Sequence, residues 1–282
     1  MTSRSLGALA ILLPGLLVLL LFFVLPLIGM FDISLHGFAG PGQVTSTLTA
    51  SSYLQFVADP YYRTVLLRTL GIGLAVTAVC LLLGYPYAYM LVRSSRRVTA
   101  LLTVLVLVPL MTSVIVRTYG WMLLFGKSGP LTPLLALLGL PQIELMYSVT
   151  GTVIALAQVL LPFMVLSLAT AIQQIRSELE DSVRSLGGGA LQVMTDVLIP
   201  LSLPGMAAGS ILVFTLSISA FATPLLIGGV RTKVVATVVY EQAITLLNWP
   251  TASAGAFVLT LIAVLLAWLQ ARIIRWRMQW TH

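Results

Sequence analysis

Few side chains in this sequence could take part directly in chemistry, and their spacing argues against an enzyme. The chain has two histidines, His36 and His282, and one cysteine, Cys80. Isolated histidines without a cysteine or carboxylate cluster make no metal site, and no serine, histidine and acid form a pattern typical of nucleophilic catalysis. No glycine-rich loop ends in Gly-Lys-Ser or Gly-Lys-Thr, which would hold ATP. We therefore expect no catalytic residue, no metal and no bound cofactor in this chain.

Acidic side chains, which are scarce in this sequence, gather in one segment, residues 173–200. Four of the eight acidic residues lie in it, namely Glu178, Glu180, Asp181 and Asp196. The order Ser177-Glu-Leu-Glu180 fits a capping box, in which the serine and the second glutamate satisfy backbone donors at a helix start. We therefore expect a helix to start here.

Apolar side chains and glycines in the same segment predict an amphipathic helix with a sharp end. The apolar positions recur along one helix face and are Leu179, Val183 and Leu186. The run Gly187-Gly188-Gly189 predicts a helix end with a positive φ at one glycine. A second helical stretch follows, and Pro200 and Pro204 mark the start of the next apolar segment. Such a helix–turn–helix suits a groove on another protein; a surface loop lying on a membrane is the alternative.

The composition places these elements in a membrane. Of the 282 residues, 59% are hydrophobic and 8% are charged, whereas soluble domains carry about 25% charged residues. The net charge is +7, but the basic residues are scattered between apolar blocks rather than gathered on one face. They therefore indicate membrane topology rather than a nucleic-acid surface.

Six segments are long and apolar enough to cross a bilayer, which needs about 20 helical residues. They are approximately residues 6–30, 66–92, 98–125, 149–172, 201–227 and 252–269. The first exceeds the apolar length of a cleaved signal peptide, so we expect it to be retained. Arg68 and Arg117 lie toward segment ends, where long side chains reach the headgroups. The expected fold is an all-α integral membrane protein with a single transmembrane domain over 1–282.

The distribution of lysine and arginine predicts that both termini are cytoplasmic. With the N-terminus inside, the inner segments hold nine basic residues: Arg4, Arg93, Arg96, Arg97, Arg176, Arg184, Arg272, Arg275 and Arg277. The outer segments hold six: Arg63, Arg68, Arg117, Lys127, Arg231 and Lys233. An excess of basic residues marks the cytoplasmic side. Three outer connections are long, 31–65, 126–148 and 228–251, and residues 131–140 are expected to form a short helix along the outer surface.

The cytoplasmic segment resembles the "EAA" loop of binding-protein-dependent ABC importer permeases. That pattern is Glu-Ala-Ala, three residues, Gly, nine residues and Ile-x-Leu-Pro, and the chain reads Asp181-Ser-Val183, Gly187 and Val197-Leu-Ile-Pro200 at the same spacing. Asp replaces Glu, Ser-Val replaces Ala-Ala, Val replaces Ile and Ile replaces Leu. The resemblance implies a type I ABC importer permease fold, with six transmembrane helices and a cytoplasmic coupling helix between spans 4 and 5. The implied ATPase-coupling residues are Glu180, Asp181, Ser182, Val183, Leu186, Gly187 and Pro200.

Further motifs are similar to the spermidine/putrescine-type branch of these permeases. They are the segments 117–121, 223–229 and 248–250. The segments 13–15 and 25–26 look like the first span of the wider family, and 59–62 and 84–88 look like the entry and exit of its second span. The resemblance implies a multi-pass protein of the bacterial inner membrane that works with a second homologous permease, a periplasmic solute-binding protein and a cytoplasmic ABC ATPase dimer. ATP and Mg²⁺ would be bound by the ATPase subunits, which drive import by alternating access.

The leading expectation for the solute is a polyamine such as putrescine or spermidine; an amino-acid-like or opine-like carboxylate is the alternative. Aromatic and acidic or amide side chains near the predicted outer span ends are candidates for the solute path, or else belong to an interfacial belt. They are Tyr119, Trp121, Tyr240, Glu241, Asn248 and Trp249. No carboxylate or lysine lies at mid-depth, as a coupled carrier would use. A secondary transporter or channel, a membrane enzyme and a structural adaptor remain weaker alternatives.

Overall fold

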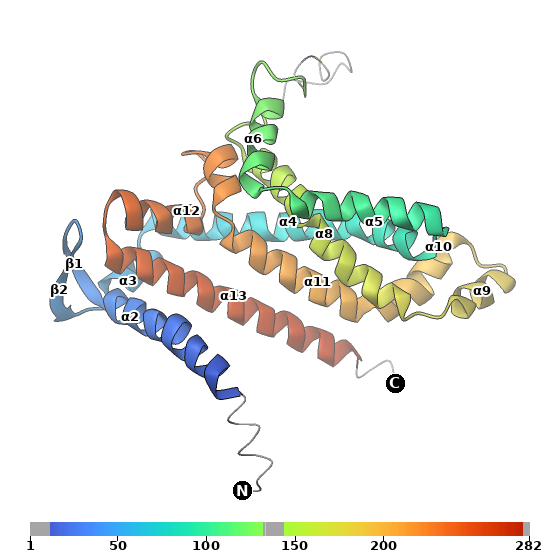
Figure 1. Cartoon of the computed structure of the whole chain (residues 1–282), viewed down its shortest axis with the longest axis horizontal. Helices are drawn as coiled ribbons and strands as arrows, with labels where there is room; N and C mark the ends of the chain where they lie inside the picture. The colour runs from blue at the N-terminus through green and yellow to red at the C-terminus, as the bar shows by residue number, and fades with distance from the viewer. Residues whose placement is uncertain (1–11, 132, 134–143, 279–282) are drawn as a thin grey trace, which may run out of the picture. The chain divides into compact units, whose positions relative to one another are not determined.

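The structure is a computed structural model that describes residues 12–131, 133 and 144–278 (Figure 1). The chain forms two compact units, and each is described by itself. Unit 1 comprises Met1–Arg63 and Val238–Val258, and unit 2 comprises Thr64–Thr237 and Leu259–His282. The predicted surface helix at 131–140 falls almost entirely outside the described residues.

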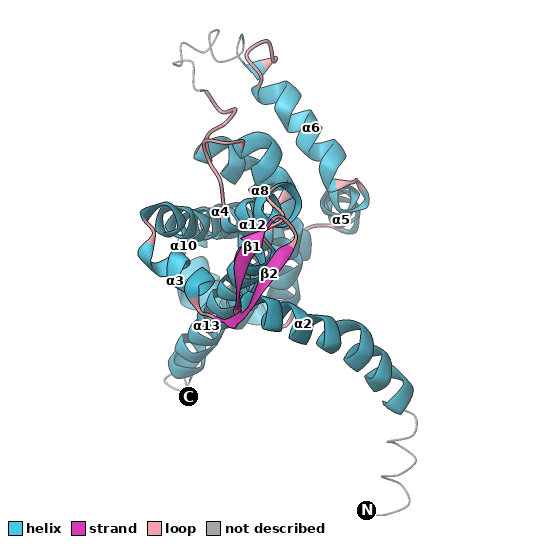
Figure 2. Ribbon diagram, turned by 90° about the vertical axis from the view of Figure 1, so that its left-hand side faces the viewer, coloured by secondary structure: helices cyan, strands magenta, loops and turns pink. Residues whose placement is uncertain are grey.

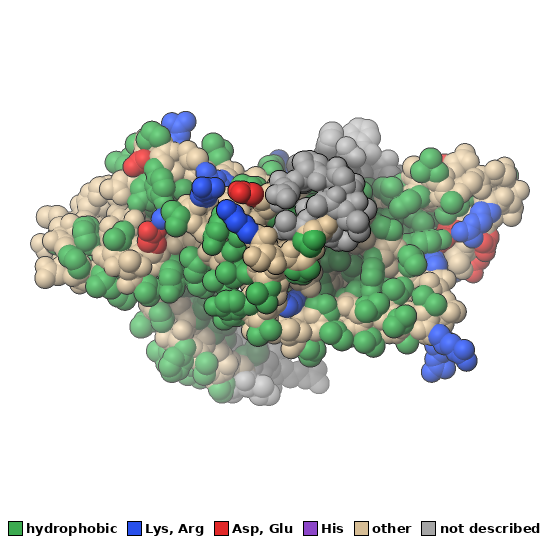
Figure 3. Space-filling view, turned by 90° about the horizontal axis from the view of Figure 1, so that it is seen from above, with side chains coloured by type: hydrophobic (Ala, Val, Ile, Leu, Met, Phe, Trp, Pro, Cys, Tyr) green, Lys and Arg blue, Asp and Glu red, His purple; other side chains and the backbone are tan. Residues whose placement is uncertain are grey.

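Long apolar helices dominate the described part of the chain. Five are long and apolar enough to cross a membrane: Leu12–Ser34, which includes η1 (Leu20–Val24) and α2 (Leu25–Ser34); α4 (Pro60–Arg93); α8 (Val149–Gln173); Ala190–Ser219; and Trp249–Leu269, the first part of α13 (Trp249–Met278). Figure 3 shows a face on which hydrophobic side chains far outnumber charged ones. Because lipid solvates such surfaces, the expectation of a helical multi-span membrane protein is confirmed.

The predicted segment 98–125 is not one straight helix. It is built from α5 (Arg96–Met111) and α6 (Val114–Phe125), whose axes differ by 99°. The backbone is extended at Thr112, with ψ 137°, so the helix cannot continue there. The expected six spans are reached within the described residues only when this bent pair is counted as one.

In unit 1 the chain adds a β-hairpin to the helices, which the all-α expectation had not included. Strands β1 (His36–Gly40) and β2 (Gln43–Leu48) pair antiparallel (Figure 2). Gly42, with φ 73°, allows the tight turn between them. The helix α3 (Ser51–Ala58) follows the hairpin.

The core of unit 1 forms where α3 meets the first turns of α13. The ring of Phe56 lies 4.6 Å from that of Tyr62. A Cβ on Gly255 would lie 2.7 Å from the Phe56 ring, so glycine is what lets α13 approach α3 this closely. The π-helix η4 (Glu241–Thr245), which continues α12 (Val235–Tyr240), also belongs to this unit.

The core of unit 2 is the packing of α8 against α11 (Ile199–Ser219). Its fully buried side chains include Met164, Leu168, Ile172 and Val213. A Cβ on Gly209 would lie 2.7 Å from the sulfur of Met164, and one on Gly205 would meet the Cβ of Ala171. Small residues at such a spacing let membrane helices approach closely.

The fifth span begins earlier than the position of Pro200 indicated. Helix α10 (Ala190–Val193), the π-helix η2 (Met194–Leu198) and α11 form one continuous helix through Pro200. Proline lacks an N–H and its ring clashes with the carbonyl four residues back. The wider turn before Pro200, where the Ile199 N–H reaches the Met194 carbonyl five residues back, accommodates the ring. This helix ends at Ser219, and Pro224–Gly228 forms a separate π-helix, η3.

Candidate functional site

The predicted coupling segment contains a short helix, α9 (Ser177–Ser185), between α8 and α10. Figure 1 shows it, in gold, where α8 ends and α10 begins. The expected capping box is wrong, because Arg176 is the N-cap and no side chain caps it. Ser177 is already inside the helix, and the carboxylate of Glu180 bonds elsewhere.

Glu180 lies inside unit 2 and is only 2% exposed. Its Oε1 accepts a hydrogen bond of 2.8 Å from Arg93 Nε and lies 2.8 Å from Arg93 Nη2. Its Oε2 accepts a bond of 3.1 Å from the Tyr89 hydroxyl and lies 3.7 Å from a nitrogen of Arg184. A buried carboxylate needs such partners, since an unpaired charge there is costly. These contacts decide the orientation of α9.

Arg93 also bonds to the connection that precedes α9. Its Nη2 donates to the carbonyl of Ile175 at 2.8 Å. Because Arg93 is the last residue of α4, one guanidinium joins α4, the α8–α9 connection and α9. From the sequence, Arg93 indicates only the membrane topology, and Tyr89 was not identified as a functional residue. No local pattern in the sequence links Arg93 or Tyr89 to Glu180.

The opposite face of α9 is exposed. Asp181 is exposed and lies 3.4 Å from Arg184, while the Ser182 hydroxyl donates to the Glu178 carbonyl at 2.7 Å. Leu179 is exposed, and Leu186, the residue that follows α9, is 89% exposed. Val183 is half-buried against the core. Exposed leucines on a charged helix mark a surface that could be covered by another protein.

The glycine turn after α9 follows the sequence expectation. Gly187 has φ 87°, in the left-handed region. Gly188 N donates to the Val183 carbonyl at 2.9 Å and Gly187 N to the Arg184 carbonyl at 3.0 Å. This is the Schellman arrangement that ends many helices. The predicted positive φ is confirmed.

Two of the candidate solute-path residues lie on α6 in unit 2. Tyr119 is exposed. The Trp121 indole donates to Gln158 at 3.4 Å, and its ring lies 4.9 Å from that of Phe125. Trp121 therefore packs against α8 at one edge, and Tyr119 is the more accessible of the two.

The other four candidates lie in unit 1. Tyr240 and Trp249 are exposed, and Glu241 is half-buried. The Asn248 side chain accepts a bond of 3.2 Å from Thr251 N and so caps the start of α13. This contact gives Asn248 a structural role. That all six residues line one path stays a prediction.

The two arginines near segment ends differ in their surroundings. Arg68 Nη1 donates to the Arg231 carbonyl at 3.1 Å, so it bonds to backbone within unit 2. Arg117 is half-buried, and its Nε and Nη1 have no hydrogen-bond partner among the described residues. Its neighbour Thr118 lies 3.2 Å from Thr223, hydroxyl to hydroxyl. An unsatisfied guanidinium in a membrane helix favours a functional role.

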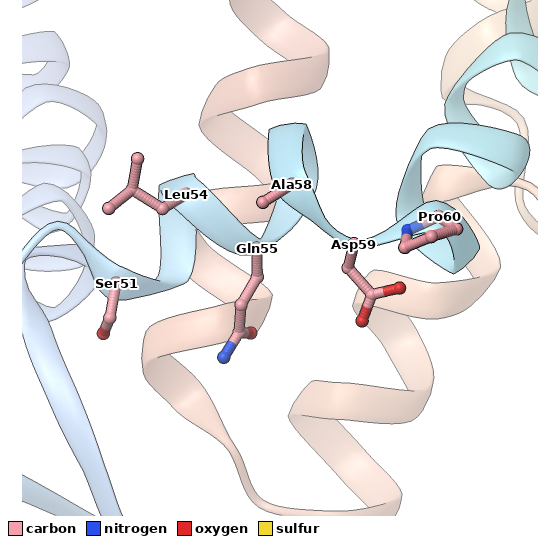
Figure 4. Close-up of a pocket in the computed structure, with 6 residues that line it drawn as sticks. All are labelled: Ser51, Leu54, Gln55, Ala58, Asp59 and Pro60. Carbon is pink, nitrogen blue, oxygen red and sulfur yellow. The ribbon is translucent and has the colours of Figure 1, made fainter.

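A shallow depression in unit 1 contains none of the candidate residues. It follows α3 and is lined by Ser51, Leu54, Gln55, Ala58, Asp59 and Pro60 (Figure 4). Asp59 Oδ1 accepts a bond of 2.8 Å from Tyr61 N, so this carboxylate supports the start of α4. The depression therefore adds no ligand to the predicted path.

Comparison with known proteins identifies transport permeases both by family model and by sequence identity. A family model described as "Binding-protein-dependent transport system inner membrane component" matches residues 80–278. The chain is 32% identical over 236 residues to the spermidine/putrescine transport system permease protein PotB of Escherichia coli (strain K12), covering 82% of this chain and 86% of that protein. It is 31% identical over 256 residues to PotB of Haemophilus influenzae, covering 90% and 89%.

The fold is similar to that of a solved transporter. A chain of the bacterial alginate ABC transporter, in complex with alginate pentasaccharide-bound periplasmic protein, matches with a TM-score of 0.78. The match covers 96% of this chain and 95% of that chain at 16% sequence identity. At this identity the likeness concerns the fold alone.

Proposed function

Because this chain belongs to the family of binding-protein-dependent transport system inner membrane components and is an ABC importer permease, we propose that it moves a polyamine from the periplasm to the cytoplasm. The observation that carries the solute class is the identity of 32% with PotB over 82% of this chain. The resemblance inferred from residues 181–200 is confirmed at the level of the family. The inner-membrane, multi-pass location follows with it.

The energy for transport enters through α9. Its exposed leucines and Asp181 offer a docking face for an ATPase subunit, and Glu180 holds the helix against α4. ATP binding closes the ATPase dimer, α9 moves as a rigid body, and the spans alternate between outward- and inward-facing states. ATP and Mg²⁺ bind to the ATPase subunits, a second permease completes the pathway, and a periplasmic binding protein delivers the solute.

A carboxylate-bearing solute is the second candidate, and Arg117 favours it. Its Nε and Nη1 have no hydrogen-bond partner among the described residues. A guanidinium binds carboxylates well and repels ammonium groups. If Arg117 faces the solute path, an amino-acid-like or opine-like solute suits it better than a polycation.

Uptake by the complete complex in proteoliposomes decides between these solutes. Labelled putrescine or spermidine is expected to accumulate when ATP and the loaded binding protein are supplied. A tenfold excess of a carboxylate-bearing amino acid should not compete. Accumulation of such a carboxylate, with no accumulation of either polyamine, would contradict the polyamine proposal and leave the importer assignment intact.

We propose that both termini are cytoplasmic, because basic residues are in excess on that side. A reporter enzyme that works only in the cytoplasm is expected to be active when it is fused after His282, and a reporter that works only in the periplasm is expected to be inactive there. The matched control is the same reporter inserted after Gly42, in the turn of the hairpin, which is expected on the outer side. Activity of a periplasm-dependent reporter after His282 would overturn this topology.

A further inference from the structure

The buried ion pair between Glu180 and Arg93 joins the exposed helix α9 to the last residue of a membrane span. The inference drawn from it rests on the proposed importer function. We propose that this ion pair is the link through which a displacement of α9 is transmitted to α4. In this role Glu180 and Arg93 are positioning residues that contact neither solute nor nucleotide.

The geometry of the pair suits the transmission of a force. Two nitrogens of Arg93 lie 2.8 Å from Oε1 of Glu180, and the side chain of Glu180 is 3% exposed. Low exposure weakens screening by water and salt, so the pair holds its geometry better than a surface ion pair does. The Tyr89 hydroxyl, one helical turn before Arg93, binds the other carboxylate oxygen at 3.1 Å. Glu180 is therefore attached to α4 at two successive turns.

Covalent connectivity alone does not give this coupling. In sequence, α9 is joined to α8 and α10, and 87 positions separate Glu180 from Arg93. The glycines that follow α9 allow the chain to bend there. The side-chain contacts with Arg93 and Tyr89 are what attach α9 to α4, so removing them leaves α9 free to move without that span.

The test compares Glu180→Gln and Arg93→Gln with two control variants in the complete complex. Glu178→Gln is the matched control for the carboxylate, because Glu178 is an exposed residue of the same helix. Arg97→Gln is the control for the guanidinium, since Arg97 is exposed in the first turn of α5. Co-purification of the ATPase, ATP hydrolysis and solute uptake are measured for each variant.

Glu180→Gln and Arg93→Gln are expected to retain the ATPase and to hydrolyse ATP, while the solute transported per ATP falls by about tenfold or more, within the usual range of coupling between sites. Both controls should match the wild type. Arg93→Lys keeps the positive charge but loses the two-pronged hydrogen bonding of the guanidinium. This variant should recover part of the lost ratio of transported solute to hydrolysed ATP. If the pair served only to stabilise the fold, the glutamine variants would lose folded complex without a change in the solute transported per ATP.

Two results would overturn the link. One is a wild-type ratio of solute to ATP in Glu180→Gln or Arg93→Gln. The other is a parallel loss of ATPase binding, hydrolysis and uptake, which would show that the pair only stabilises α9. Absence of ATP-dependent uptake by the wild-type complex is a different result, which would reject the proposed function and the link together.

Discussion

Gly205→Leu is expected to prevent α8 and α11 from packing and to remove most of the folded protein. A Cβ at this position already meets the Cβ of Ala171 and lies 3.0 Å from the Ser167 carbonyl oxygen. Leucine adds three further carbons where none fits. Overpacking in a core costs about 1–3 kcal/mol and occasionally more, and here backbone atoms of α8 block any local adjustment. Thermal unfolding in detergent and the yield of monodisperse protein measure the effect.

Gly71→Leu is the matched control for this substitution. Gly71 lies in α4 of the same unit, and a Cβ there has no atom within 4 Å. Leucine also has a higher helix propensity than glycine, so this variant should be at least as stable as the wild type. If both variants unfold at the wild-type temperature, close packing of α8 on α11 does not hold unit 2 together.

Gly187→Pro is expected to abolish uptake while the protein remains inserted in the membrane. Gly187 has φ 87°, and its N–H donates to the Arg184 carbonyl at 3.0 Å. Proline fixes φ near −65° and has no N–H, so the turn after α9 must change. The exposed face of α9 would then meet the ATPase in a different orientation. Uptake and ATPase co-purification provide the measurement.

Gly189→Pro tests whether the effect is specific to that turn. Gly189 has φ −80°, within the range of proline, and a Cβ there has no atom within 4 Å. This variant should retain most of the uptake. The independent variant Asp181→Arg reverses a charge on the exposed face, and mismatched charges at an interface cost several kcal/mol. Wild-type uptake by both Gly187→Pro and Asp181→Arg would show that this segment does not couple to the ATPase.

The membrane spans were predictable because the thickness of the bilayer fixes the length of an apolar segment. The bend at Thr112 was not, since an average of hydropathy over residues 98–125 hides the extended backbone at this one residue. The path of the chain through Pro200 was missed for a related reason. Proline usually marks a helix start, but a π-turn immediately before it lets the helix continue.

In the coupling segment, local rules succeeded for the backbone and failed for one side chain. The positive φ at Gly187 follows from the glycine run itself. The role of Glu180 depends on Arg93, which is distant in sequence. No pattern of neighbouring residues therefore indicated that Glu180 would bond to Arg93 instead of forming a capping box. A buried, charge-assisted pair is stronger than a cap at an exposed helix end, and this difference decides which contact forms.

If a separate ATPase drives transport through this chain, as we propose, solute accumulation must depend on ATP hydrolysis. Proteoliposomes that contain the complete complex are loaded with ATP or with a non-hydrolysable analogue, with and without a protonophore. We predict accumulation with ATP, none with the analogue, and no effect of the protonophore. Accumulation that persists with the analogue and disappears with the protonophore would contradict transport driven by an ATPase and identify an ion-driven transporter.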